Sequence, residues 1–203
     1  MRSINVLLCT LGLAILVAGC SGIATQPEQS EAEAGTKPKK SSTANTQLER
    51  EFQAAQQLLR KNKTDQAKAQ LQALIEQNPR LASPHINLGN IQLGEDDPNA
   101  AERSFNAALK INPKSLPAHN QLGVALRMQG RFNEAEQAYR AAIELEPDYH
   151  LAHRNLGILY DLYLAKPELA LQHYQRYQAL VENKDREIEG WIIDLQRRTN
   201  AKR

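Results

Sequence analysis

A repeat with a 34-residue period constrains the fold of this chain more than any other feature of its sequence. Leu-Gly pairs begin at Leu88, Leu122 and Leu156, each one such period after the pair before it. Three prolines keep the same spacing: Pro79, Pro113 and Pro147. Self-similarity at such a period is typical of stacked supersecondary units, because each unit buries its apolar face against its neighbours.

The residues between these markers predict that each unit is a pair of helices. A small residue, an aromatic residue and an alanine follow the Leu-Gly pair at fixed distances in two periods: Ala101, Phe105 and Ala108, then Ala135, Tyr139 and Ala142. Small residues that face large ones let two helices approach closely. A proline cannot continue the second helix, so the chain turns there and begins the next hairpin.

This pattern resembles the tetratricopeptide repeat, in which Leu-Gly stands on the first helix, and Ala, an aromatic residue, Ala and Pro stand on and after the second. The resemblance implies an all-α fold, a right-handed superhelix of antiparallel helical hairpins with a C-terminal capping helix. Repeats are expected at about residues 48–81, 82–115, 116–149 and 150–184, and the capping helix at about 186–199.

The first and last repeats depart from the pattern. Ala54-Ala55 replaces the Leu-Gly pair in the first repeat. In the last repeat, Ala170 and Tyr174 come one residue late, which predicts a lengthened turn through Ala165-Lys166-Pro167. The capping helix is predicted by apolar residues that recur at helical spacing: Ile188, Trp191, Ile192 and Leu195.

Aromatic residues gather toward the C-terminus: Tyr160, Tyr163, Tyr174, Tyr177 and Trp191. Two interpretations are open at this stage. The residues form hydrophobic core between the last hairpin and its cap, or they form an exposed patch that binds a partner.

The N-terminus reads as a targeting segment. Met1 and Arg2 precede a short apolar run that ends in Val17-Ala18-Gly19-Cys20. That tetrapeptide resembles the lipobox of bacterial lipoproteins, in which the cysteine carries a diacylglycerol and becomes the new N-terminus. It predicts a signal peptide over 1–19, lipidated Cys20 with a flexible linker over 20–45, and a repeat domain over 46–203. An uncleaved anchor helix and an ordinary secretory signal are the alternatives.

The residue after the cysteine bears on location. By the sorting rule of Gram-negative lipoproteins, aspartate at this position retains a lipoprotein in the inner membrane, and most other residues send it to the outer one. Ser21 stands here. We therefore expect the protein in the bacterial cell envelope, anchored by lipid to the outer membrane and facing the periplasm.

Composition and motifs argue against several other functions. The 25 Lys and Arg residues nearly balance the 23 Asp and Glu residues, so no large positive field attracts nucleic acid. Both cysteines, Cys9 and Cys20, precede the repeat domain, which excludes thiol chemistry there. No Gly-rich phosphate loop or hydrolase motif occurs, and Asp96-Asp97 beside Pro98 reads as a helix cap. We expect no catalytic site and no cofactor.

Three histidines also keep the 34-residue spacing: His85, His119 and His153. A shared metal site is a possible interpretation of this ladder. Equivalent helices of neighbouring repeats lie at least about 8–10 Å apart, whereas zinc holds its nitrogen ligands at about 2.0–2.1 Å. Packing between repeats is therefore the better interpretation, and no metal site is expected.

The resemblance to tetratricopeptide repeats implies a concave face lined by the first helix of each hairpin, which binds a peptide or helix of another protein. The polar residues expected along this groove are Asn87, Asn90, Asn120, Arg127, Arg154, Asn155 and Asp161. The expected partner is another envelope protein or peptide, with the membrane contacted through the lipid anchor.

A lipoprotein of this architecture resembles the pilotins of type IV pili, which help a secretin reach and assemble in the outer membrane. The favoured hypothesis is a scaffold that assists an envelope machine such as a type IV pilus or secretion system. It also resembles envelope adaptors that organise peptidoglycan hydrolases. An enzyme with an unrecognised site and a structural spacer are the remaining alternatives, since fold alone does not choose a function.

Overall fold

The computed structural model describes residues 40–201, with side chains from Thr46 onward. The expected signal peptide, Cys20 and nearly all of the expected linker lie outside the described residues. The described part of the chain forms nine α-helices and no strand. They are α1 (Lys40–Arg60), α2 (Thr64–Gln77), α3 (Ala82–Gly94), α4 (Pro98–Ile111), α5 (Leu116–Met128), α6 (Phe132–Leu145), α7 (His150–Leu162), α8 (Pro167–Leu180) and α9 (Arg186–Asn200).

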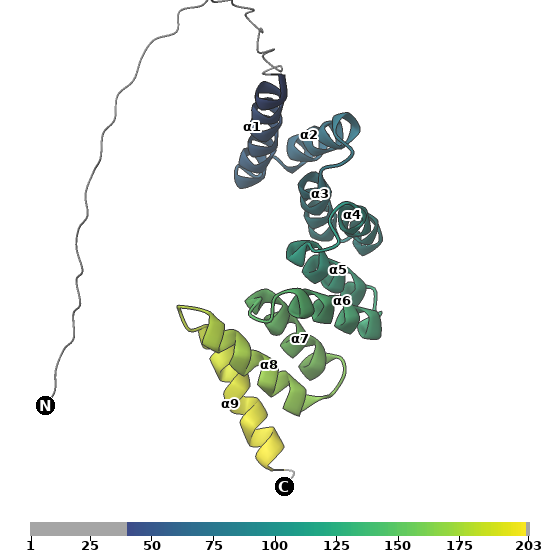
Figure 1. Cartoon of the computed structure of the whole chain (residues 1–203). Helices are drawn as coiled ribbons and strands as arrows, with labels where there is room; N and C mark the ends of the chain where they lie inside the picture. The colour runs from purple at the N-terminus through teal and green to yellow at the C-terminus, as the bar shows by residue number, and fades with distance from the viewer. Residues whose placement is uncertain (1–39, 202–203) are drawn as a thin grey trace, which may run out of the picture. The chain divides into compact units, whose positions relative to one another are not determined.

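The helices pair as hairpins that follow one another along the chain (Figure 1). The four hairpins are α1–α2, α3–α4, α5–α6 and α7–α8, and α9 packs on α8. The first helices also contact one another, α3 with α5 and α5 with α7. This arrangement confirms the all-α fold of stacked hairpins with a capping helix. Among the described helices, none has the length and apolar content needed to cross a membrane.

The first helix is longer than the repeat pattern predicted. It begins at Lys40, before the expected domain start at residue 46, and within the segment expected to be linker. Neither proline nor glycine occurs between Pro38 and Pro79, so no helix breaker interrupts the chain from Lys40 into the first repeat.

Each Leu-Gly glycine lies against the aromatic ring of its own hairpin. A Cβ added to Gly89 would lie 2.5 Å from the ring of Phe105, and one added to Gly123 would lie 2.5 Å from the ring of Tyr139. Gly157 has the same relation to Tyr174. All three rings belong to residues that are 0% exposed. The structure therefore confirms that the small residue is needed for the close approach of the two helices.

The turn inside the last hairpin is one residue longer than its counterparts. Three residues separate α3 from α4 and α5 from α6, whereas four residues, 163–166, separate α7 from α8. Ala165 takes a positive φ of 51° in this turn, and the Lys166 N–H donates to the Tyr160 carbonyl at 2.8 Å. The predicted lengthening is confirmed, and it explains why Ala170 and Tyr174 come one residue late.

The C-terminal aromatic residues are mostly core. Tyr160 and Tyr174 are 0% exposed, and the ring of Trp191 packs against Tyr174 with centroids 5.4 Å apart. The Tyr177 hydroxyl donates to Asp185, whose side chain caps α9. Only Tyr163 is substantially exposed, at 41%. The core interpretation therefore holds for this group except at Tyr163.

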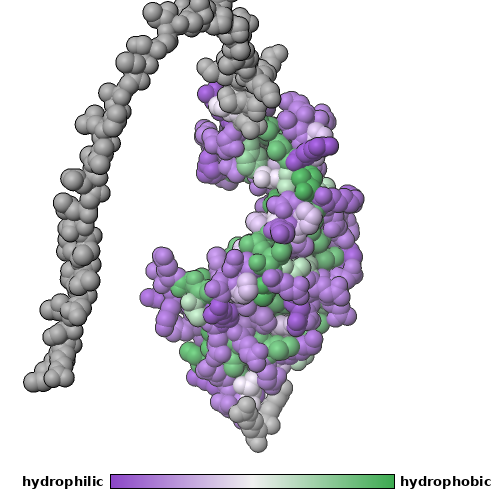
Figure 2. Space-filling view, viewed as in Figure 1, coloured by the Kyte–Doolittle hydropathy of each residue, from purple (hydrophilic) through white to green (hydrophobic). Residues whose placement is uncertain are grey.

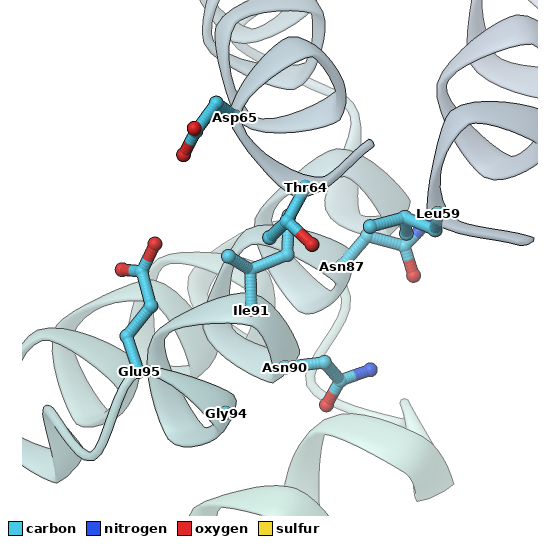
Figure 3. Close-up of a pocket in the computed structure, with 8 residues that line it drawn as sticks. All are labelled: Leu59, Thr64, Asp65, Asn87, Asn90, Ile91, Gly94 and Glu95. Atoms are coloured by element: carbon cyan, nitrogen blue, oxygen red, sulfur yellow. The ribbon is translucent and has the colours of Figure 1, made fainter. Parts of the chain in front are cut away.

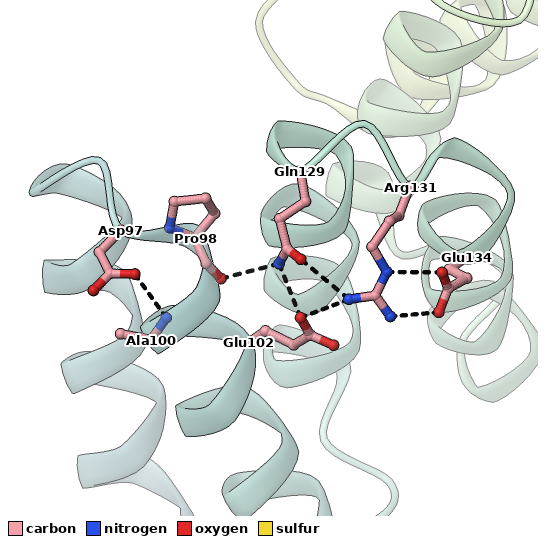
Figure 4. Close-up of polar contacts among 7 residues, drawn as sticks. All are labelled: Asp97, Pro98, Ala100, Glu102, Gln129, Arg131 and Glu134. Carbon is pink, nitrogen blue, oxygen red and sulfur yellow. Dashed lines mark hydrogen bonds and ion pairs between the residues drawn. The ribbon is translucent and has the colours of Figure 1, made fainter.

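Polar contacts fix the second hairpin against the third (Figure 4). Gln129 donates to the Pro98 carbonyl at 3.2 Å and to Glu102 at 2.9 Å. Arg131 bridges Glu102 at 2.7 Å and Glu134 at 2.5 Å. These hydrogen bonds to carboxylates raise the pKa of Arg131. The bonds join turns that the repeat period places side by side, so they hold the register of the stack.

The cap expected at Asp96-Asp97 is present at one of the two residues. The Asp97 side chain accepts from the Ala100 N–H at 2.9 Å, and Pro98 occupies the first position of α4 (Figure 4). Asp96 takes a positive φ of 59° in the turn. The Asp97 carboxylate thus caps α4, and Asp96 contributes through its backbone in the turn.

Candidate protein-binding groove

A row of polar side chains connects the first helices of successive hairpins. Gln121 on α5 donates to Asn90 on α3 at 2.7 Å, and Asn155 on α7 donates to Asn120 on α5 at 2.9 Å. We call the polar side chains of this face the inner row, and its members are Asn87, Asn90, Asn120, Gln121, Arg127, Arg154, Asn155 and Asp161. Figure 2 shows a hollow on this side of the helical unit, with hydrophobic surface at the level of α5.

Asn120 lies beneath the others in this row. It is 3% exposed, and its amide contacts both Gln121 and Asn155. A buried amide with partners on two sides is costly to disturb, because a lost partner leaves a polar group without a hydrogen bond. In the free protein Asn120 therefore positions Asn155, whose side chain is only half-buried.

Asn87 and Asn90 line a pocket of about 530 Å³ at the N-terminal end of the row. Figure 3 shows their amides on one side of the pocket and the carboxylates of Asp65 and Glu95 on the other, with Ile91 between them. Ile91 is 6% exposed and forms an apolar floor. Glu95 is paired with Lys68 at 2.6 Å, a contact near the surface that adds little to stability.

Arg127 lies near the middle of the row without an acidic partner in the described part of the chain. Its Nη1 donates to the Tyr163 hydroxyl at 3.1 Å, and its guanidinium carbon lies 5.5 Å from the Tyr163 ring centroid. Its Nε is buried and has no hydrogen-bond partner, like the hydroxyl of Tyr139 nearby. Burial raises the pKa of Tyr139 to about 12, against the opposing effect of Arg127.

The other two charged members differ in their partners. Asp161 is paired with Arg198 of α9 at 3.0 Å, and the side chain of Asp161 is only 10% exposed. Arg154 is half-buried, and it forms no ion pair with any described residue. The C-terminal half of the inner row therefore carries two guanidinium groups whose charges no carboxylate neutralises.

Comparison with known families decides what this arrangement is. One tetratricopeptide-repeat model matches residues 52–115, and a second matches residues 117–149. The chain contains tetratricopeptide repeats. Domains built from these repeats bind protein partners and are generally non-enzymatic scaffolds. A search of curated proteins finds no match.

Solved tetratricopeptide-repeat structures share the fold. Pseudomonas aeruginosa pilF is 24% identical, with a TM-score of 0.70 over 77% of this chain and 71% of that one. A thermophilic TPR protein of Thermus thermophilus is 19% identical, with a TM-score of 0.63 over 73% and 80%. MamA from Desulfovibrio magneticus RS-1 is 18% identical, with a TM-score of 0.58 over 66% and 75%. At these identities the likeness shows the fold alone.

The repeat register reveals a groove residue that the sequence interpretation missed. Gln121 stands one full repeat period after Asn87 and one before Asn155, so the period alone assigns it to the same face. Two further contacts had no such signal. Tyr163 lies in the lengthened turn, and Arg198 lies in the capping helix, outside the repeated units.

Of the three periodic histidines, His119 and His153 each contact the end of the preceding repeat. The rings of His119 and His153 lie 2.8 Å and 3.0 Å from the carbonyl oxygens of Pro113 and Pro147. His153 also contacts His173 of α8, with 2.9 Å between their Nδ1 atoms. Over the described residues there is no group of three or more side chains suited to hold a metal ion. Their observed role is packing and hydrogen bonding between repeats.

Proposed function

We propose that the protein is a lipid-anchored scaffold of the bacterial envelope that binds a segment of another envelope protein along the inner row. By this proposal it assists the assembly of an envelope machine such as a type IV pilus or a secretion system. The observation that carries the binding part is the row itself, polar side chains on the first helices of three successive repeats that are joined by hydrogen bonds between α3 and α5 and between α5 and α7.

The chemistry of the row suits a peptide backbone. The amides of Asn87, Asn90, Gln121 and Asn155 each carry donors and an acceptor, so they can pair with the N–H and C=O groups of an extended or helical segment. Asn90 is exposed, and Asn87, Gln121 and Asn155 are half-buried, so all four reach solvent. Hydrogen bonds between helices hold Asn90, Gln121 and Asn155 in place. A rigid scaffold of this kind loses little entropy on binding.

The location rests on the sequence. Cys20 ends a segment that resembles a lipobox, and the several acyl chains of a mature lipoprotein hold it on a bilayer far better than one chain does, at about 0.8 kcal/mol per buried methylene. Support for the pilus or secretion role comes from the resemblance to pilotins and from the fold that the chain shares with Pseudomonas aeruginosa pilF.

Chemical crosslinking followed by affinity capture from envelopes of the native host tests this function. The triple variant Asn90→Ala, Gln121→Ala, Arg154→Ala removes side chains of the inner row. A matched triple variant on the second helices, Arg103→Ala, Glu144→Ala, Lys110→Ala, removes polar side chains away from it. We expect wild type and the matched variant to recover the same pilus or secretion component, and the inner-row variant to lose it at an unchanged melting temperature.

Two results would contradict the proposal. Recovery of peptidoglycan hydrolases in place of an assembly component would favour the adaptor alternative. Capture that survives the inner-row changes and is lost on Tyr163→Ala would move the binding surface to the exposed part of the C-terminal aromatic group.

A further inference from the structure

Among the described arginines, Arg127 alone has an Nε that is buried without a hydrogen-bond partner. Arg131, Arg140, Arg176 and Arg198 each pair with a carboxylate. Arg127 is more deeply placed than Arg140, yet only neutral tyrosines contact it, and its Nε has no hydrogen-bond partner. A half-buried cation has lost part of its hydration, so an anion that approaches it gains more than it would at a fully solvated arginine.

The guanidinium is held in place before any partner arrives. Tyr163 accepts a hydrogen bond from Arg127, and the ring of Tyr163 packs against Phe132 with centroids 4.9 Å apart. The buried Tyr139 hydroxyl, also without a hydrogen-bond partner, lies close enough to interact electrostatically with Arg127. Since Tyr163 is 41% exposed, the site opens to solvent. A preorganised donor of this kind gives up little side-chain entropy when it binds.

Exposed apolar side chains stand next to Arg127 and Tyr163 in the sequence. Met128 follows Arg127 directly and is 41% exposed, and Leu162 precedes Tyr163 directly and is 65% exposed. Met128 and Leu162 are one repeat period apart, so they occupy equivalent places on α5 and α7, which contact each other. Val124 and Ile158, one turn earlier on the same helices, are half-buried. An apolar strip therefore runs across two repeats beside an unpaired cation.

The charged residues beside the apolar strip indicate what kind of peptide segment can bind there. Arg154, on the turn of α7 before Ile158, also has no ion pair with a described residue, whereas the nearest acid of the row, Asp161, is already paired with Arg198. A basic peptide would meet two unpaired guanidinium groups, and like charges at an interface are strongly disfavoured. An acidic group complements them.

We propose that the strip Val124, Met128, Ile158 and Leu162 binds an amphipathic segment of a partner protein, and that an Asp or Glu of this segment pairs with Arg127. The carboxylate accepts from the Nη groups of Arg127, and large apolar side chains on either side of it cover Met128 and Leu162. This inference rests on the proposed function, because it names the chemistry of the segment that the scaffold binds.

A peptide selection tests the inference without a known partner. The full chain is used to select binders from a library of random 16-residue peptides, and the strongest binder is made as a synthetic peptide in two forms, with its acidic residue intact or changed to the amide. Among selected sequences we expect enrichment of Asp or Glu flanked by large apolar residues.

Dissociation constants of the two peptides are then measured with wild type and Arg127→Gln. Hydrogen bonds to charged groups contribute enough that the acid-to-amide change should weaken binding to wild type by about 10-fold to 100-fold. The change should have no effect on binding to Arg127→Gln. Arg127→Lys keeps the charge and should retain part of the discrimination. Arg103→Gln on α4, an exposed arginine without an ion pair among described residues, is the matched control and should behave as wild type.

The inference is overturned if no acidic peptides are enriched, or if Arg127→Gln distinguishes the two peptides as wild type does. Melting temperatures of all variants show whether the fold is intact, and Arg127→Lys serves if Arg127→Gln is unfolded. Equal capture of the native partner by wild type and Arg127→Gln would also reject the role of Arg127, and would leave the proposed function standing.

Discussion

Replacing Gly123 by alanine should destabilise the fold although alanine is the better helix former. Gly123 lies within α5, where alanine is favoured over glycine by about 1 kcal/mol. The added Cβ would lie 2.5 Å from Cε1 of Tyr139, where ordinary contacts begin near 3.4 Å. The ring would have to move by about 1 Å in a core where Tyr139 is 0% exposed.

Overpacking of this kind typically costs about 1–3 kcal/mol, so the net loss in the free energy of unfolding should be on the order of 1–2 kcal/mol. Gly123→Leu, with three more carbons than alanine, should cost several kcal/mol. Glu136→Gln should cost less, because glutamine keeps an acceptor for the Tyr160 hydroxyl and loses only ion pairs with the exposed Arg140 and Lys166. Urea unfolding followed by circular dichroism measures these differences.

Gly190→Ala is the matched control. Gly190 lies inside α9, and a Cβ there would meet no atom within 4 Å. Its replacement should therefore raise the free energy of unfolding by about 0.5–1 kcal/mol. Gly123→Ala should therefore lower the free energy of unfolding, and Gly190→Ala should raise it. If Gly123→Ala stabilises the protein as Gly190→Ala does, the close packing of α5 on α6 is wrong.

Three further predictions concern the expected lipid anchor at Cys20, the buried histidine His173 and the buried hydroxyl of Tyr174. Cys20→Ala should abolish incorporation of labelled fatty acid, and persistent label on the variant would reject the lipoprotein interpretation. Burial and the neighbouring His153 lower the pKa of His173 to about 4 from 6.5. Below pH 6.5 the unfolded chain therefore binds a proton at this residue more readily than the folded chain, and the free energy of unfolding should fall as the pH is lowered from 6.5 to 4. His173→Gln should flatten the dependence of the melting temperature on pH over that range, and an unchanged slope would assign it to other groups. Tyr174→Phe removes a buried hydroxyl without a hydrogen-bond partner and should leave the free energy of unfolding unchanged or raise it by up to about 1 kcal/mol, whereas a clear loss in thermal or urea melts would reveal an unrecognised partner.

The fold could be predicted because the residues that pack the two helices of each hairpin together recur along the sequence with the repeat. The small Gly123 packs against the large Tyr139, and the same pairing recurs in the neighbouring repeats, one residue later in the last of them. The start of α1 at Lys40 could not be predicted in the same way, since residues before Leu48 belong to no repeat and have no periodic partner. Pro38 stands two residues before Lys40, but a single proline occurs as readily inside a linker as before a helix, so it does not fix the boundary.

The candidate site was only partly predictable for a related reason. The repeat register assigns Asn87, Gln121 and Asn155 to one face, because they follow one another at the repeat period. The register does not reveal that Asn120 is buried beneath that face, with 3% exposure, because its burial depends on how the neighbouring helices cross. The contact of Arg127 with Tyr163 depends on the four-residue turn of the last hairpin, and the pairing of Asp161 with Arg198 depends on α9. Each of these two contacts involves a residue outside the regular repeat pattern, Tyr163 in the turn and Arg198 in the capping helix.

Site-specific photocrosslinking in the native envelope tests the central claim most directly. A photoreactive residue is placed at Gln121 in the inner row, and in a parallel strain at Arg103 on the outer helix α4, an exposed position. The account predicts a crosslink from position 121 to a defined envelope protein, through a segment with an acidic residue between large apolar ones, and none from position 103. Crosslinks from position 103 to that protein, with none from position 121, would contradict it.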